Sequence, residues 1–334
     1  MRIKAALLGF ILLTALYVGV LVWADARHHV FDGLVPLATV LPALLVLSLV
    51  TYVARYARWH WLLARAGHVT PVFRGFLAYL AGFAFTATPG KVGELVRIRY
   101  LGPMGVPGWR VIAAFVFERA MDLLVVLALA TLAIRDRRLM ALAVAFVVLC
   151  LMLVIVLARH PSLLGRLGRR LGAAGLHRGA SALQALAQGF AGCRVWLRPA
   201  DLVLSAGLGL LAWGGTALGF VHLLHDLGVS TLPQAEALAI YPLAMLAGAA
   251  SMLPGGIGST EAAIAALLAL SGVPLAIGVL AAVGIRLATL WFAILCGLVS
   301  AAILEIWSPG GQVRQMEEAA ADAPPRSMNE EIFE

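Results

Sequence analysis

Two apolar stretches of the chain are each interrupted by a Pro-Gly dipeptide and continue at once into polar or charged residues. The first break, residues 86–101, reads TATPGKVGELVRIRYL, and the second, residues 249–261, reads AASMLPGGIGSTE. Each break is followed further along the chain by an arginine inside an apolar run, Arg119 and Arg286 respectively. Broken apolar segments with ionisable groups, one in each half of a chain, are typical of membrane transporters built from a repeat.

The composition supports a membrane protein. The chain is 62% hydrophobic and 13% charged, with a mean hydropathy of +0.95. Soluble domains are about 45–50% apolar and about 25% charged. The net charge of +8 is expected to reside in cytoplasmic loops, so no nucleic-acid partner is expected. The three cysteines form no metal or redox motif, and neither a metal nor a cofactor is expected.

Six apolar runs are expected to cross the bilayer, because each approaches or exceeds the length of about 20 residues that a spanning helix needs. They comprise residues 5–23, 37–54, 107–134, 139–158, 202–224 and 275–303. The first run exceeds the usual core of about 7–15 residues in a cleaved signal peptide, which favours a retained helix. Arginines and tryptophans after the second run are expected to anchor its cytoplasmic end; they are Arg55, Arg58, Trp59, Trp61 and Arg65.

The remaining apolar segments are interpreted as two re-entrant hairpins. Residues 73–88 are short and have basic residues on both sides, so this segment is expected to enter and return near Pro89-Gly90. Residues 232–270 contain the second break at residues 254–258. The fold class is therefore an all-α polytopic membrane protein with six crossings, or eight if the second hairpin spans fully.

The directions in which the predicted segments cross the membrane indicate an inverted repeat. Residues 37–134 and 202–303 would each consist of a helix, a hairpin and a helix, running in opposite directions, with both termini cytoplasmic. A basic segment, residues 159–198, links them and is predicted to form one or two amphipathic helices on the inner membrane surface. The membrane domain would cover residues 1–305, and the acidic tail, residues 306–334, is expected to be disordered.

The interior of the run 107–134 carries a cluster of three charged residues: Glu118, Arg119 and Asp122. A charge at the bilayer centre costs from about 2.5 to more than about 10 kcal/mol, so such residues need partners or a function. Arg119 lies three residues before Asp122 and is placed to pair with it on a helix. Two interpretations remain: a buried ion pair that fixes helix packing, and a polar lining for a substrate head group. The position of the three residues well inside the run favours the second.

The residues around the breaks suggest an anion site. The second break begins a half-helix whose N–H groups attract anions, and a phosphate there could be held by Ser259, Thr260 and Arg286. Glu261 would take a proton or pair with Arg286, or else serve only as a helix cap. At the first break, basic side chains would guide anionic lipid heads or act as ordinary positive-inside anchors; they are Lys91, Arg97 and Arg99.

Several motifs together resemble the transmembrane flippase-type domain family of lysylphosphatidylglycerol synthases, including its free-standing members. The likeness lies in Arg58-Trp59 with Leu62-Leu63, residues 89–97 (PGKVGELVR), Glu118-Arg119-x-x-Asp122-Leu123, residues 254–261 (PGGIGSTE) and Arg286-Leu287, and it spans roughly residues 5–305. The resemblance implies a bacterial cytoplasmic membrane protein tied to lipid or glycolipid translocation. The chain ends at Glu334 with an acidic tail, so it is expected to lack the synthase domain and its activity.

The leading hypothesis is a lipid flippase for an anionic phospholipid or a glycolipid. Arg97, Arg119 and Arg286 would contact phosphate, and carboxylates would pair with them between states; these are Glu94, Glu118, Asp122 and Glu261. The second hypothesis is a scaffold that regulates a lipid- or glycan-modifying enzyme. A membrane enzyme using Glu118 and Asp122 as acid and base, a small soluble anion as substrate, and a homodimer also remain as alternatives; the absence of catalytic motifs favours a protein that is not an enzyme.

Overall fold

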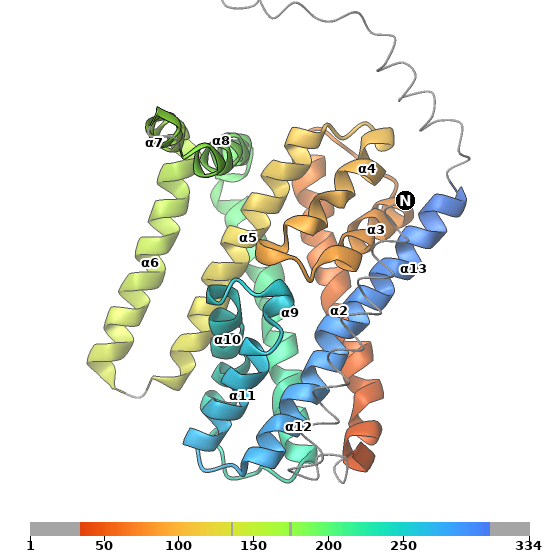
Figure 1. The fold of residues 1–334 in the computed structure, drawn as a ribbon, viewed down its shortest axis with the longest axis vertical. Helices are drawn as coiled ribbons and strands as arrows, with labels where there is room; N and C mark the ends of the chain where they lie inside the picture. Colours follow the sequence, from red (N-terminus) through yellow and green to blue (C-terminus); the bar gives the residue numbers. More distant parts are fainter. Residues whose placement is uncertain (1–33, 135, 174–175, 308–334) are drawn as a thin grey trace, which may run out of the picture.

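The computed structural model describes residues 34–134, 136–173 and 176–307, and within these ranges the regular elements are helices (Figure 1). The predicted all-α class is confirmed. The α-helices are α2 (Leu34–Arg65), α3 (Val72–Ala81), α4 (Arg97–Leu101), α5 (Gly108–Ala130), α6 (Arg137–Arg159), α7 (Ser162–Ala173), α8 (His177–Gly192), α9 (Pro199–Asp226), α10 (Gln234–Ala250), α11 (Ser259–Leu270), α12 (Leu275–Arg286) and α13 (Phe292–Trp307). Shorter turns include η2 (Gly82–Phe85), η3 (Pro89–Val96), η7 (Pro254–Gly256) and a π-helical turn, η8 (Leu287–Trp291), which joins α12 to α13.

Four stretches are long and apolar enough to cross a membrane: Leu37–Arg65, Arg137–Arg159, Pro199–Asp226 and Leu275–Trp307. Helix α5 has 23 residues and could span, but it carries the three charged residues noted in the sequence. The protein is therefore a multi-pass membrane protein. The predicted first crossing, residues 5–23, and the predicted tail, residues 306–334, lie outside the described residues except for the last two positions of α13.

Each Pro-Gly break forms the turn of a helical hairpin. In Figure 1, α3 and α4 occupy the upper half of the bundle, and α10 and α11 occupy the lower half. The two turns approach one another in the middle, where a Cβ atom built on Gly255 would lie 3.4 Å from the Cβ of Ala87. That the hairpins are re-entrant in a bilayer stays a prediction.

The elements of the two halves run in opposite senses. In Figure 1, α2 ascends and α5 descends around the first hairpin, whereas α9 descends and α12–α13 ascends around the second. This is the order of directions that an inverted repeat requires. A repeat at the level of sequence or ancestry stays a prediction.

Helix α2 differs from its predicted extent. It continues to Arg65 instead of ending at residue 54, and both Arg58 and Trp59 are 1% exposed. The expectation that these two residues anchor the membrane interface is therefore wrong. The reason lies in their partners, because Arg58 meets carboxylates of α5 and Trp59 packs against Tyr79 of α3, with ring centroids 5.6 Å apart.

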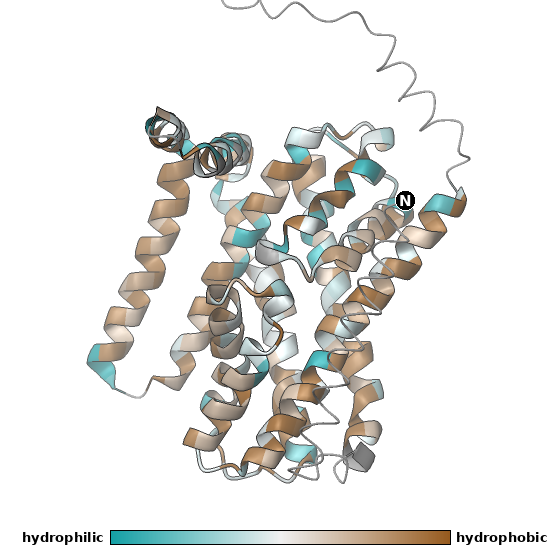
Figure 2. Cartoon of the chain, in the orientation of Figure 1, coloured by the Kyte–Doolittle hydropathy of each residue, from teal (hydrophilic) through white to brown (hydrophobic). Residues whose placement is uncertain are grey.

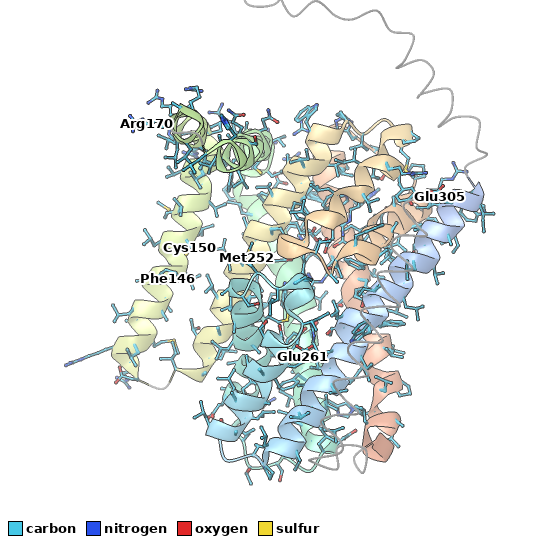
Figure 3. The ribbon with its side chains drawn as sticks, in the orientation of Figure 1. Phe146, Cys150, Arg170, Met252, Glu261 and Glu305 are labelled. Carbon is cyan, nitrogen blue, oxygen red and sulfur yellow. The ribbon has the colours of Figure 1, made fainter. Side chains whose placement is uncertain are left out.

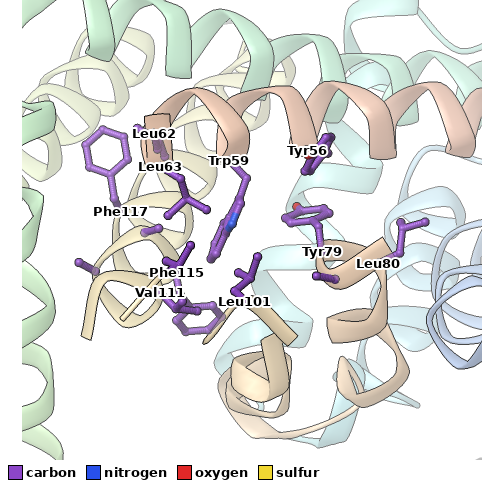
Figure 4. Packing of buried hydrophobic residues seen from close by; sticks show 14 of the residues in the cluster. Tyr56, Trp59, Leu62, Leu63, Tyr79, Leu80, Leu101, Val111, Phe115 and Phe117 are labelled. Carbon is purple, nitrogen blue, oxygen red and sulfur yellow. The ribbon is translucent and has the colours of Figure 1, made fainter. Parts of the chain in front are cut away.

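The core around the first hairpin is an aromatic cluster shared by α2, α3, α4 and α5. Figure 4 shows Trp59 between Tyr79, Leu101 and Phe115, so residues far apart in sequence meet there. Lipid offers no hydrophobic drive for helices to associate, and membrane helices depend instead on close packing at small residues. Gly297 of α13 is one such position, since a Cβ there would overlap the backbone nitrogen of Ala84.

Helix α6 stands apart from the bundle. Within it only Ala158 is buried, and in Figure 2 its ribbon has the colour of hydrophobic residues along most of its length. Helices α7 and α8 lie across the end of α6 in Figure 1, with Arg170 projecting outward in Figure 3. The segment of residues 159–198, which was expected to form one or two amphipathic helices, therefore forms two, α7 and α8.

Candidate functional site

Glu118 is the centre of a buried charged network in the middle of α5. Its Oε1 accepts hydrogen bonds from the Tyr79 hydroxyl at 2.7 Å and from Nη2 of Arg58 at 3.2 Å. Its Oε2 lies 3.1 Å from Nη2 of Arg119 and 3.5 Å from Nη1 of Arg97. One carboxylate thus joins α2, the first hairpin and α5.

Asp122 lies one turn further along α5 and holds a second set of arginines. It is 2.7 Å from Nη2 of Arg58 and 3.2 Å from Nη1 of Arg55. The pairing with Arg119 that the helical spacing predicts is confirmed, at 3.3 Å. Since two carboxylates share these cations, each charge in the network has a partner of opposite sign at close range.

Arg97 is completely buried beneath the first hairpin. Its Nη2 is 2.9 Å from Glu94, its Nε donates to the Tyr79 carbonyl at 3.0 Å, and its guanidinium lies 4.0 Å from the Tyr79 ring centroid. Its burial contradicts the expectation that Arg97 guides lipid head groups at the membrane surface. Arg99 remains on the surface and pairs with Glu305 at 2.9 Å.

Lys91 sits at the first break in a left-handed backbone conformation, with φ of 57°. Such a conformation is costly for a residue with a side chain, and it persists only where the surroundings impose it. No carboxylate of the described residues lies within 4.0 Å of the Lys91 ammonium. Lys91 therefore differs from the arginines around it, which have acidic partners.

The second break is closed by an interaction between Arg286 and Glu261. Arg286 donates from Nε to Glu261 at 2.8 Å and from Nη2 to the Gly255 carbonyl at 2.6 Å. The other Glu261 oxygen accepts from the Gly258 N–H at 2.8 Å, so Glu261 both caps α11 and pairs with Arg286. Gly255 adopts φ of 62°, a conformation that suits glycine.

The other two predicted residues of this break differ from each other. The Ser259 hydroxyl donates to the Gly256 carbonyl at 3.1 Å and is thus used within the turn. Thr260 is completely buried, and its hydroxyl has no hydrogen-bond partner among the described residues. The structure therefore places both residues at the turn, but only Thr260 has a spare hydrogen-bonding group.

A cavity of about 240 Å³ lies between the two breaks. It is lined by Thr88, Gly90, Lys91, Arg119, Asp122, Leu123, Val126, Trp213, Met245, Leu246, Gly248, Ala249, Met252, Leu253, Gly255, Gly256 and Thr260. A smaller cavity of about 90 Å³ adjoins it, sharing Lys91, Arg119 and Trp213, and extends to Arg55, Glu94 and Arg286. Predicted site residues of both halves of the chain thus surround one space, although Arg97, Glu118, Ser259 and Glu261 line neither cavity.

The mouth of this cavity is apolar. Leu123, Met252 and Leu253 line the cavity, yet they are 48%, 64% and 47% exposed. In Figure 3, Met252 lies at mid-height of the bundle, away from both ends. The space therefore combines a charged inner wall with an apolar rim.

Sequence reasoning missed four members of this site: Arg55, Arg58, Tyr79 and Trp213. Arg55 and Arg58 lie three residues apart on α2, and this helical spacing was a signal that they share a face. Trp213 carried no local signal; it lines both cavities, and its ring lies 4.8 Å from the Arg55 guanidinium.

These features define a polytopic membrane protein with an ionisable site inside its helical bundle, an arrangement typical of substrate pathways. A comparison with family models agrees with this class. The chain belongs to the family described as lysylphosphatidylglycerol synthase TM region, whose model matches residues 5–297. Neither a curated protein nor a solved structure matches the chain.

Proposed function

We propose that this protein moves the polar head group of a phospholipid or glycolipid between the leaflets of a bacterial cytoplasmic membrane. The observation that carries the proposal is the cavity between the two breaks, with its charged wall and apolar rim. A lipid has the same two-part character. Its head group would occupy the cavity while its acyl chains remain in the bilayer along Leu123, Met252 and Leu253.

The cavity would lower the barrier to translocation by replacing water around the head group. A bare charged or polar group cannot cross hydrocarbon cheaply, and membrane proteins therefore line such paths with ionisable side chains. Lys91 and Arg119 reach the cavity from the first half of the chain, and Thr260 reaches it from the second. A head group between the leaflets would thus keep polar contacts throughout its passage.

Movement requires the two breaks to separate. The turns meet at Ala87 and Gly255, and this contact would close the path between the two halves of an inverted pair. Each hairpin is held by its own ion pair, Arg97 with Glu94 and Arg286 with Glu261. The halves can then rock as rigid units, driven by the lipid gradient or by protons.

Leaflet exchange in proteoliposomes tests the proposal. Fluorescent phospholipids and glycolipids would be reconstituted with the wild type, Arg119→Leu and the control Arg99→Leu, which removes an exposed cation outside the cavity. We expect the wild type and Arg99→Leu to accelerate exchange of at least one lipid, and Arg119→Leu to reduce that rate at least tenfold. Failure of the wild type to accelerate any of these lipids would contradict the proposal and favour the scaffold hypothesis.

A further inference from the structure

We propose that the cavity seats a phosphate monoester, the dianionic end group of a lipid or a free phosphate, on Lys91, Arg119, Trp213 and Thr260. This inference rests on the proposed function, because it names the substrate chemistry of the same cavity. It also moves the phosphate away from Arg97 and Arg286, because Arg97 lines neither cavity and the Arg286 guanidinium is held by Glu261 and the Gly255 carbonyl.

The charged side chains in and behind the cavity do not balance one another. The described charged side chains in and behind the cavity comprise six cations, Arg55, Arg58, Lys91, Arg97, Arg119 and Arg286, and four carboxylates, Glu94, Glu118, Asp122 and Glu261. Two positive charges are left over in the interior of a membrane protein, where unbalanced charge is costly. A phosphate monoester carries up to two negative charges, whereas a phosphodiester carries one.

The surplus positive charge is not spread evenly over these residues. Arg58 is shared between Glu118 and Asp122, and Arg286 is held by Glu261. Lys91 lacks a carboxylate partner among the described residues, and it lines both cavities together with Arg119. The cation without a carboxylate partner, Lys91, therefore lies where a ligand has room to bind, beside Arg119, which Glu118 and Asp122 already pair.

Two neutral hydrogen-bond donors also border the cavity. Nε1 of Trp213 and the hydroxyl of Thr260 are buried, border the cavity and have no hydrogen-bond partner in the described part of the chain. Buried donors are normally satisfied by protein, water or ligand. The indole N–H can only donate, so its partner must be an acceptor. Phosphate oxygens are strong acceptors, and an ammonium head group offers none.

Equilibrium binding to the full-length protein in neutral detergent tests the seat. The probes are fluorescent phosphatidic acid as the monoester lipid, phosphatidylglycerol as the diester lipid and inorganic phosphate as a competitor. We expect the wild type to bind phosphatidic acid at least tenfold more tightly than phosphatidylglycerol. Competition by millimolar inorganic phosphate would identify a free phosphate as the source, and its failure to compete would identify the lipid.

Variants locate the binding. Lys91→Met should weaken phosphatidic acid binding at least tenfold, and Lys91→Arg, which restores the charge, should recover most of that loss. Thr260→Val keeps the shape of the side chain and should weaken binding severalfold. Arg170→Met removes an equal charge from the surface of α7 and should change the affinity less than twofold, which controls for attraction of anionic lipid to the surface. Equal affinity for both lipids, or wild-type binding by Lys91→Met, would overturn the phosphate seat.

The binding and exchange experiments can contradict the phosphate seat and the translocation proposal independently of each other. If phosphatidic acid binds with these dependences but no lipid exchanges between leaflets, the phosphate seat stands and the translocation proposal fails. If lipids exchange rapidly but neither the phosphate group nor Lys91 affects the rate or the binding, translocation stands and the seat is wrong.

Discussion

Arg286 and Glu261 are 25 residues apart in the sequence, yet Nε of the arginine donates to the carboxylate at 2.8 Å. The same guanidinium holds the carbonyl of Gly255 at 2.6 Å. A residue of α12 thus fixes both the turn and the start of the helix that follows it. Arg286 thus acts as a clamp on the second break: it belongs to α12 and binds both Glu261 and Gly255.

Removing this clamp should destabilise the protein. Arg286→Leu leaves Glu261 without its cation, and breaking a buried ion pair from one side costs about 3–5 kcal/mol. Thermal unfolding in detergent should show a clear fall in Tm. The double variant Arg286→Leu/Glu261→Leu should lose less than the two single losses added together, since the two residues interact directly. Strict additivity would contradict the clamp.

Glu118 should matter far more than the hydroxyl that bonds to it. Glu118→Gln keeps the shape of the side chain but removes the negative charge that Arg58, Arg97 and Arg119 share. Tyr79→Phe removes one hydrogen bond, a loss of about 0.5–1.5 kcal/mol. Thermal unfolding of both variants measures the difference, and equal shifts in Tm would show that Glu118 does not bind the network together.

Close packing of α13 against the first hairpin can be tested at Gly297. A methyl group at this position overlaps the backbone of Ala84, so Gly297→Ala should push α13 away at a cost of about 1–3 kcal/mol. Gly102→Ala is the matched control, because among the described residues no atom beyond its chain neighbours and the local helix backbone lies within 4 Å of the methyl group that it adds. If both substitutions lower Tm equally, the close contact between α13 and η2 is contradicted.

The placement of the two ends of the bundle predicts which residues reagents reach from each side. Ser181 on α8 and Ser230 between α9 and α10 are both exposed. In Figure 1, α8 and the segment that joins α9 to α10 lie at opposite ends of the bundle. In a cysteine-free background, Ser181→Cys should react with an impermeant maleimide only in inverted vesicles, and Ser230→Cys only in intact spheroplasts. Labelling of both from one side would contradict the topology.

Much of this architecture follows from the sequence, for a physical reason. Backbone polar groups within lipid must be satisfied inside the segment, so apolar runs of sufficient length become helices, and their lengths predict the bundle. The two breaks were also predictable, because Pro-Gly sequences end a helix and supply left-handed turns. The short π-helical turn between α12 and α13 has no comparable signature.

The partners within the site were harder to predict, because they are set by tertiary contacts. A charged residue near the end of an apolar run resembles an interfacial anchor, and Arg58 and Arg97 were misread for this reason. Arg58 meets Glu118 only when α2 packs against α5, and Arg97, besides its local partner Glu94, lies against Trp59 of α2 and Glu118 of α5 only when the first hairpin packs between them. The pair Arg119–Asp122 was predictable because both residues lie on one helix.

The central claim is that lipid head groups pass between the two breaks, and a reversible cross-link tests it most directly. Ala87→Cys/Gly255→Cys places two Cβ atoms about 3.4 Å apart, close to the mean of about 3.8 Å in disulfides. The background would lack Cys150, Cys193 and Cys296, and each single cysteine variant would control for strain at Gly255. With the bond fully formed, leaflet exchange should stop and should return on reduction. If the fully cross-linked protein exchanges lipids as fast as the protein whose disulfide has been reduced, passage between the breaks is contradicted.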